Sequence, residues 1–249
     1  MTIAPKTIFS DVIEKVNAVL HGGRYANPSD FEWRKIKREC ENLRNTDAAA
    51  GWAALSSLYA AFGDVVEMKR CYVASRHLRL DSAVESNFLA NLGNLGLFDE
   101  ALKFFIEHGN PTIGNFSSML SHGFEIGAFQ TIVGFSELAK TMNIDPSPEI
   151  LSKSAAAAAV LSRAGLNDQD IAHHLNAVGN VLRDRKIFHY AMPEVRTSDV
   201  DGDFSGVTVV FRVSGSSDDV FEMNVALAEQ EDVMNIKKDS SFDALFLPL

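Results

Sequence analysis

The chain has 249 residues, of which 46% are hydrophobic and 22% charged, and its formal net charge at pH 7 is −10. This composition is typical of a folded globular protein, and it argues against a disordered chain or one that needs a metal or disulfides to fold. The chain begins without an apolar stretch behind a positive flank, and its most apolar run, residues 155–161, is too short to span a bilayer. We therefore expect a cytoplasmic protein, not bound to membranes, whose two cysteines, Cys40 and Cys71, are free thiols.

Residues 6–145 are predicted to form short amphipathic helices separated by glycines. Gly63, Gly96 and Gly123 each lie between two stretches of helical apolar periodicity, where a helix end needs a residue that tolerates positive φ. Gly23 and Gly165 occupy similar places. A single helical hairpin cannot cover its own apolar face, so successive hairpins are expected to stack side by side.

Two consecutive units between Ala49 and about Asn115 carry the clearest repeat. Aromatic and leucine positions recur in both units, at Trp52, Leu55, Tyr59 and Tyr72 in the first and at Phe88, Leu92 and Phe105 in the second, where Ala101 adds a small residue. This pattern resembles the tetratricopeptide repeat, although Met68 stands where that family has a small residue. The resemblance implies a solenoid of helical hairpins that binds another protein.

The chain changes character after the Asp145-Pro-Ser-Pro sequence. Residues 150–164 and 167–186 are predicted to be two further helices. Alternating apolar residues then predict strands over 187–195, 207–213 and 221–227, and a last one over 242–249, with turns at 199–206 and 214–219. The predicted fold class is α+β: a helical-repeat domain over 1–145, then a domain over 146–249 with a small antiparallel sheet packed on the helix at 167–186.

In tetratricopeptide proteins the first helix of each unit lines a groove that takes a peptide. The corresponding segments here, 49–62 and 84–95, contain no Lys or Arg, which disfavours a clamp for a chain-terminal carboxylate. Their polar side chains are mainly Asn87, Asn91 and Asn94, so we expect an amide-lined or apolar groove. The alternatives are a groove filled by the C-terminal domain, or a face that is simply buried core.

Charge provides the other candidate binding residues. Residues 30–80 carry nine basic and seven acidic groups, for a net charge of +2, and most of these are expected to be solvated helix faces. Contact with an acidic partner, through Arg70 and Arg76, is the alternative. Residues 187–249 carry four basic and twelve acidic groups, for a net charge of −8, which disfavours nucleic-acid binding and favours a basic partner near Asp218, Asp219 and Glu222.

No catalytic, cofactor or metal site is predicted. His173 and His174 are neighbours on a helix and so point about 100° apart, which suits chelation poorly. Arg183 and His189 are spaced as in a class of helical ribonucleases, but a motif of two residues is weak evidence.

The leading hypothesis is a non-catalytic adaptor, chaperone or regulator that binds another protein through its helical surface. The alternative is an immunity protein or antitoxin that neutralises a basic toxin or enzyme through its acidic C-terminal domain. A ribonuclease using Arg183 and His189 is a second, weaker alternative. A homo-oligomer is compatible with each hypothesis.

Overall fold

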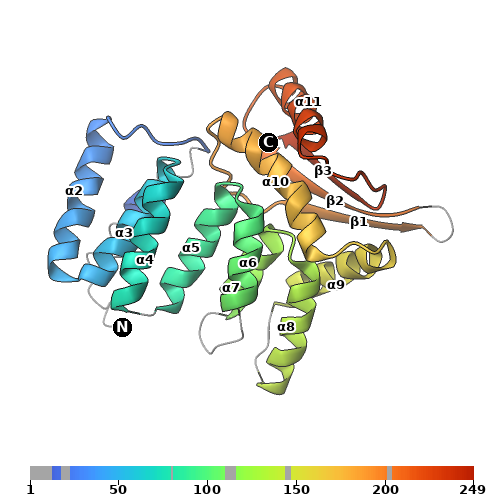
Figure 1. The fold of residues 1–249 in the computed structure, drawn as a ribbon, viewed down its shortest axis with the longest axis horizontal. Coiled ribbons are helices and arrows are strands. Elements are labelled where there is room, and N and C mark those ends of the chain that lie inside the picture. Colours follow the sequence, from blue (N-terminus) through green and yellow to red (C-terminus); the bar gives the residue numbers. More distant parts are fainter. Residues whose placement is uncertain (1–12, 18–22, 80, 110–115, 144–146, 201–203) are drawn as a thin grey trace, which may run out of the picture. The chain divides into compact units, whose positions relative to one another are not determined.

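A computed structural model describes residues 13–17, 23–79, 81–109, 116–143, 147–200 and 204–249 (Figure 1). Helices dominate, and three strands form one small sheet, which confirms the α+β class. Contacts divide the chain into two compact units, one of residues 1–91 with 186–190 and the other of residues 92–185 with 191–249.

The first unit is a layer of helices with α3 (Ala48–Ala61) between α2 (Phe31–Thr46) and α4 (Val65–Leu78) (Figure 1). α3 contains no charged residue and is buried along nearly its whole length, because a neighbour covers each side. Its N-terminus is capped by Asp47, whose side chain accepts a hydrogen bond from the Ala50 amide at 3.1 Å. α5 (Ser82–Asn94) starts in this unit, where Phe88 stacks on Tyr72 of α4 with ring centroids 3.7 Å apart.

Glycines end the helices at most of the predicted places. Gly63 follows α3 with φ +72°, and Gly96 follows α5 with φ +67°. The prediction for Gly123 is wrong: this residue lies inside α7 (Phe116–Glu125), and Gly127, with φ +78°, supplies the turn after that helix. Gly123 has a different role, because a Cβ there would lie 2.5 Å from the ring of Phe105, so its small size permits close packing.

The second unit continues with α6 (Phe98–His108), α7, α8 (Phe129–Thr141), α9 (Pro148–Arg163) and α10 (Asp168–Asp184). α10 is the central helix and contacts α6, α8 and α11 (Ser217–Val233). α8 also packs on α9, so helices from both sides of residue 145 share one compact unit. The domain boundary expected at residue 145 stays a prediction, since contacts alone do not show which part of a chain folds independently.

The sheet consists of β1 (Glu194–Val200), β2 (Phe204–Val213) and β3 (Phe242–Pro248), in that order. β1 pairs with β2 in antiparallel fashion, whereas β2 and β3 are parallel, with Val207 opposite Phe242. The prediction of an antiparallel sheet is therefore wrong for β3. Residues 187–193 are not part of a strand; Ile187 forms an isolated bridge with Arg24. Of the turn predicted at 199–206, residues 201–203 lie outside the described part of the chain.

Residues 217–233, expected to include a strand at 221–227, form the helix α11. Ser216 and Asp219 make a capping box at its N-terminus, and Val220, Met223 and Leu227 form its buried stripe. Parallel strands need a long crossover connection, and α11 provides it between β2 and β3. The two errors, in α11 and in the direction of β3, therefore have one cause.

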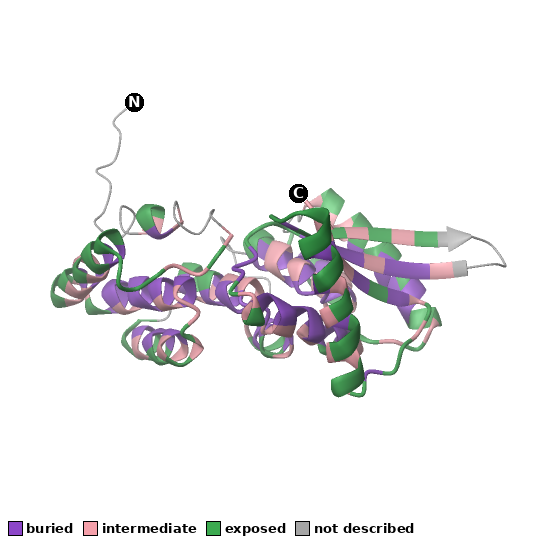
Figure 2. Cartoon of the chain, turned by 90° about the horizontal axis from the view of Figure 1, so that it is seen from above, coloured by how far each residue is buried: buried purple, intermediate pink, exposed green. Residues whose placement is uncertain are grey.

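β2 is the best-covered strand, since it is paired on both sides, and it is buried over most of its length while β1 is more exposed (Figure 2). β3 packs on α10 and α11, as predicted for the helix at 167–186. On β3, Phe246 exchanges two hydrogen bonds with the side-chain amide of Asn224 in α11: its N–H donates to Oδ1 at 2.8 Å, and its carbonyl accepts from Nδ2 at 3.0 Å.

Candidate protein-binding surfaces

Trp52 lies on the first unit between two basic side chains. Its ring lies under two guanidinium groups, with Arg44 of α2 at 4.6 Å from the ring and Arg70 of α4 at 5.2 Å. Cation–π contacts with arginine are strongest on tryptophan. The ring is half-buried, not enclosed, so part of it remains open to solvent.

Tyr59 lies two helical turns further along α3 and has the same kind of partner. The ammonium group of Lys37 is 5.4 Å from the Tyr59 ring, and a hydrogen bond from Lys37 to the Tyr59 hydroxyl raises the pKa of that lysine. Tyr59 is half-buried and packs edge-on against Phe62, 6.1 Å away. We call Lys37, Arg44, Trp52, Tyr59 and Arg70 the basic aromatic face.

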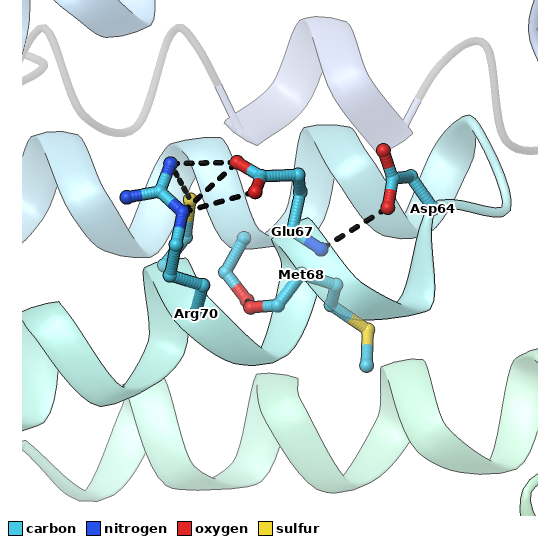
Figure 3. Close-up of polar contacts among 6 residues, drawn as sticks. Asp64, Glu67, Met68 and Arg70 are labelled. Atoms are coloured by element: carbon cyan, nitrogen blue, oxygen red, sulfur yellow. Dashed lines mark hydrogen bonds and ion pairs between the residues drawn. The ribbon is translucent and has the colours of Figure 1, made fainter.

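The Arg70 side chain is held in place by its own helix. Its guanidinium binds both carboxylate oxygens of Glu67, at 2.6–3.1 Å, and Nη2 lies 4.0 Å from Sγ of Cys71 (Figure 3). These hydrogen bonds lower the pKa of Glu67 and raise that of Arg70. The backbone beneath is fixed by Asp64, which caps α4, and by the buried Ser56 hydroxyl, which donates to the Met68 carbonyl at 2.9 Å. Arg70 is nevertheless 53% exposed and so can contact a partner.

Arg76, the other basic residue predicted to bind a partner, is exposed and pairs with Glu85 of α5 at 3.7 Å. Arg76 lies in the last turn of α4, almost two turns beyond Arg70, and does not take part in the contacts of the basic aromatic face.

The three predicted asparagines do not form an amide-lined surface. Asn87 is exposed, whereas Asn91 is 6% exposed and its amide lies 3.5 Å from the Ser57 hydroxyl, inside the first unit. Asn91 therefore holds α5 against α3, because a buried amide needs a hydrogen-bond partner. Asn94 is half-buried at the end of α5.

The predicted acidic residues lie on α11 and not on a strand. Asp219 is used by the capping box, where it accepts hydrogen bonds from the Ser216 amide and hydroxyl. Asp218 is exposed, and Glu222 lies 3.5 Å from Arg185 with its side chain 68% exposed. Beside them Phe221 and Val225 are exposed apolar residues that sequence reasoning assigned to a strand. The capping box of Ser216 and Asp219 is the signal that would have revealed the helix.

Arg183 serves the fold of the second unit. Its guanidinium donates to the side chain of Asn180 and to the carbonyl groups of Leu95 (3.1 Å) and Gly96, which form the turn after α5. His189 is buried and lies in an irregular segment instead of the predicted strand. The ribonuclease hypothesis stays a prediction.

His174 is buried on α10, and its ring packs edge-on against Phe242 with centroids 5.3 Å apart. Burial lowers the pKa of this histidine. Its neighbour His173 points away and lies 3.9 Å from Asp99. Among the described residues no three His, Cys, Asp or Glu side chains are grouped so as to hold a metal ion.

Neither family models, nor curated proteins, nor solved structures match this chain. In the part of the chain that the structure describes, no helix has both the length and the apolar character needed to cross a bilayer. Two surfaces expose aromatic or apolar side chains next to charged ones, the basic aromatic face on the first unit and the outer side of α11 on the second.

Proposed function

We propose that this protein is a non-catalytic protein-binding scaffold, an adaptor, chaperone or regulator built on tetratricopeptide-like helical hairpins. The observation that carries the proposal is Trp52, which is half-exposed between Arg44 and Arg70. Tryptophan, tyrosine and arginine are the residues that most often dominate binding energy at protein interfaces. The basic aromatic face presents all three types.

The rigidity of this face supports the proposal. Glu67 fixes the Arg70 guanidinium, and α3 is clamped on both sides by α2 and α4. A side chain that is already ordered loses less conformational entropy when it binds a partner. The basic side chains favour a partner segment that carries carboxylates as well as an apolar or aromatic side chain.

The proposal is tested by affinity capture from the native host followed by mass spectrometry. The baits are the full chain and a variant with Arg44→Ala and Arg70→Ala. Each substitution removes a cation–π contact worth about 0.5–1 kcal/mol, and Arg70→Ala also removes a surface ion pair with Glu67 worth up to about 1 kcal/mol, so the variant should stay folded. We expect a protein held by the wild type to be lost or strongly depleted with the variant.

A matched control is Lys153→Ala, which removes a cation that is 50% exposed on α9. This variant should capture the same protein as the wild type. Capture that is equal for all three baits would show that the partner does not use the basic aromatic face. The chain has two tryptophans, so a Trp33→Phe variant leaves Trp52 as the single fluorescent reporter, whose emission should change when the captured protein is added.

A second candidate function is neutralisation of a basic toxin or enzyme by the acidic C-terminal region, as an immunity protein or antitoxin would do. The observation in its favour is the composition of α11, which has six acidic residues and no Lys or Arg. A surface of one sign accelerates association with a partner of the other. Its test is inhibition of the partner's activity by the full chain, with an inhibition rate that falls as salt rises.

A further inference from the structure

α11 exposes apolar side chains although its opposite side is well packed. Val220, Met223 and Leu227 are buried against the rest of the second unit. Phe221 and Val225, by contrast, are 69% and 44% exposed. They are four residues apart, so they lie one above the other on the same side of the helix, where they form a continuous apolar strip.

Carboxylates line this strip. Asp218 lies seven residues before Val225 and Glu229 lies four residues after it, so both carboxylates are on the same side of the helix as Val225. Glu222 directly follows Phe221. Asp218 and Glu229 form no ion pair with any residue that the structure describes, and Glu222 has a single partner, Arg185 at 3.5 Å. We call Asp218, Phe221, Glu222, Val225 and Glu229 the outer face of α11.

The signs of these charges decide what can cover the outer face. A second copy that docked symmetrically through the same surface would bring carboxylates against carboxylates, which is unfavourable. Nucleic acid and anionic lipid are repelled for the same reason. A partner that carries Lys or Arg beside apolar residues satisfies both components of the face.

The shape of the face indicates the form of that partner. The two apolar side chains are one helical turn apart along α11, and the carboxylates beside them extend over about three turns. An amphipathic helix matches such a strip with residues at i, i+4 and i+7 and places its basic residues alongside. We propose that the outer face of α11 binds a basic amphipathic helical segment of another protein. This inference deepens the second candidate function and rests on it.

The test uses the full chain and fluorescently labelled synthetic peptides, with binding followed by anisotropy. One peptide arranges Leu and Lys as an amphipathic helix, a second has the same residues in an order without an apolar side, and a third replaces every Lys by Glu. We expect the first to bind, the second to bind about tenfold more weakly, and the third not to bind. Added salt should weaken the first complex.

The decisive variant is Phe221→Ala with Val225→Ala, which changes exposed side chains and leaves the buried stripe of α11 intact. It should bind the first peptide about tenfold more weakly or worse. The control is Ile106→Ala, since Ile106 is an apolar residue of α6 that is 50% exposed, and this variant should bind like the wild type. Circular dichroism shows whether each variant is folded.

Any of three peptide-binding results would overturn the inference: no binding of the amphipathic Leu/Lys peptide, equal binding of the reordered peptide, or equal binding by the double alanine variant. Self-association of the wild type that is lost in this variant would also overturn it, because a second copy would then occupy the face. Binding of the peptide at α11, without inhibition of any basic toxin or enzyme, would support the inference and contradict the neutralising function. The two failures are therefore distinguishable.

Discussion

Gly179 of α10 is the position where the structure predicts the largest effect of a single added methyl group. A Cβ on this residue would overlap the carbonyl oxygen of Gly96 and lie 2.7 Å from its carbonyl carbon and 2.9 Å from its Cα. These atoms belong to the backbone of a turn with φ +67°, so they cannot rotate away as a side chain would. One turn further along α10, Arg183 donates to the same Gly96 carbonyl. We therefore expect Gly179→Ala to push α10 away from the turn and to strain that hydrogen bond.

The magnitude combines two destabilising contributions with one stabilising contribution. Overpacking costs about 1–3 kcal/mol, and a weakened hydrogen bond from a charged donor adds about 1.5–3 kcal/mol. Alanine recovers about 1 kcal/mol through its higher helix propensity. The net loss of unfolding free energy should be about 1.5–5 kcal/mol, which for a chain of this length lowers the melting temperature by roughly 3–20 °C.

Thermal and urea unfolding followed by circular dichroism measure this change. The matched control is Gly134→Ala, because Gly134 also lies inside a helix, α8, but a Cβ there would meet nothing within 4 Å. This substitution should stabilise the protein by up to about 1 kcal/mol. If Gly179→Ala were as stable as the wild type or as Gly134→Ala, the close approach of α10 to the Gly96 turn would be refuted.

Asp168 accepts hydrogen bonds from the Gln130 amide at 2.9 Å and from the Thr131 amide and hydroxyl at 2.7 Å, so it caps α8 from the start of α10. Asp168→Ala should lower the unfolding free energy by about 1–3 kcal/mol in urea titrations, and an unchanged midpoint would contradict this role. Burial lowers the pKa of His174 below its ordinary value of 6.5, so the unfolded chain binds a proton at this histidine more readily than the folded chain does. The free energy of unfolding should therefore fall as pH decreases below about 6.5. His174→Gln should flatten this pH dependence in thermal melts at several pH values. Burial raises the pKa of Cys40 to about 12 and that of Cys71 to about 11. Both thiols should therefore react with a thiol reagent at neutral pH far faster in denaturant than in the native state. Equal rates in the two states would show that the thiols are accessible in the folded protein.

The helical half of the fold could be predicted from the sequence because its signals are local. The stripes around Leu55 and Phe105 have helical spacing, and the glycines at positions 63 and 96 take the positive φ that a helix end requires. The sequence does not reveal the role of Gly123, because a glycine needed for close packing looks the same as a glycine needed for a turn.

The C-terminal errors come from an ambiguous periodicity. Phe221, Met223, Val225 and Leu227 alternate as in a strand, but Met223 and Leu227 also belong to a helical stripe that starts at Val220. Alternation alone cannot decide between a strand and a helix here. The capping box ahead of the stripe decides for the helix. Once α11 is a helix, the parallel pairing of β3 follows from the long connection.

The candidate site was predictable in residue type but not in geometry. The charge of Arg70 makes it a candidate from the sequence alone, whereas the position of Trp52 between two guanidinium groups depends on how α2 and α4 flank α3. Asn91 is a candidate from the sequence that does not reach the surface, because its side-chain amide faces Ser57 inside the first unit.

The side-chain amide of Asn224 substitutes for a neighbouring strand at the β3 edge. It occupies both hydrogen-bonding groups of Phe246, and Asp243 accepts from the amide of Ala244 at 2.9 Å, so an incoming chain finds that side already taken. Polymerisation by sheet extension needs two free edge strands in each molecule, one to pair with the preceding molecule and one to pair with the next. With β3 closed in this way, association through the sheet would be confined to β1 and would end as a pair of molecules instead of a growing fibre.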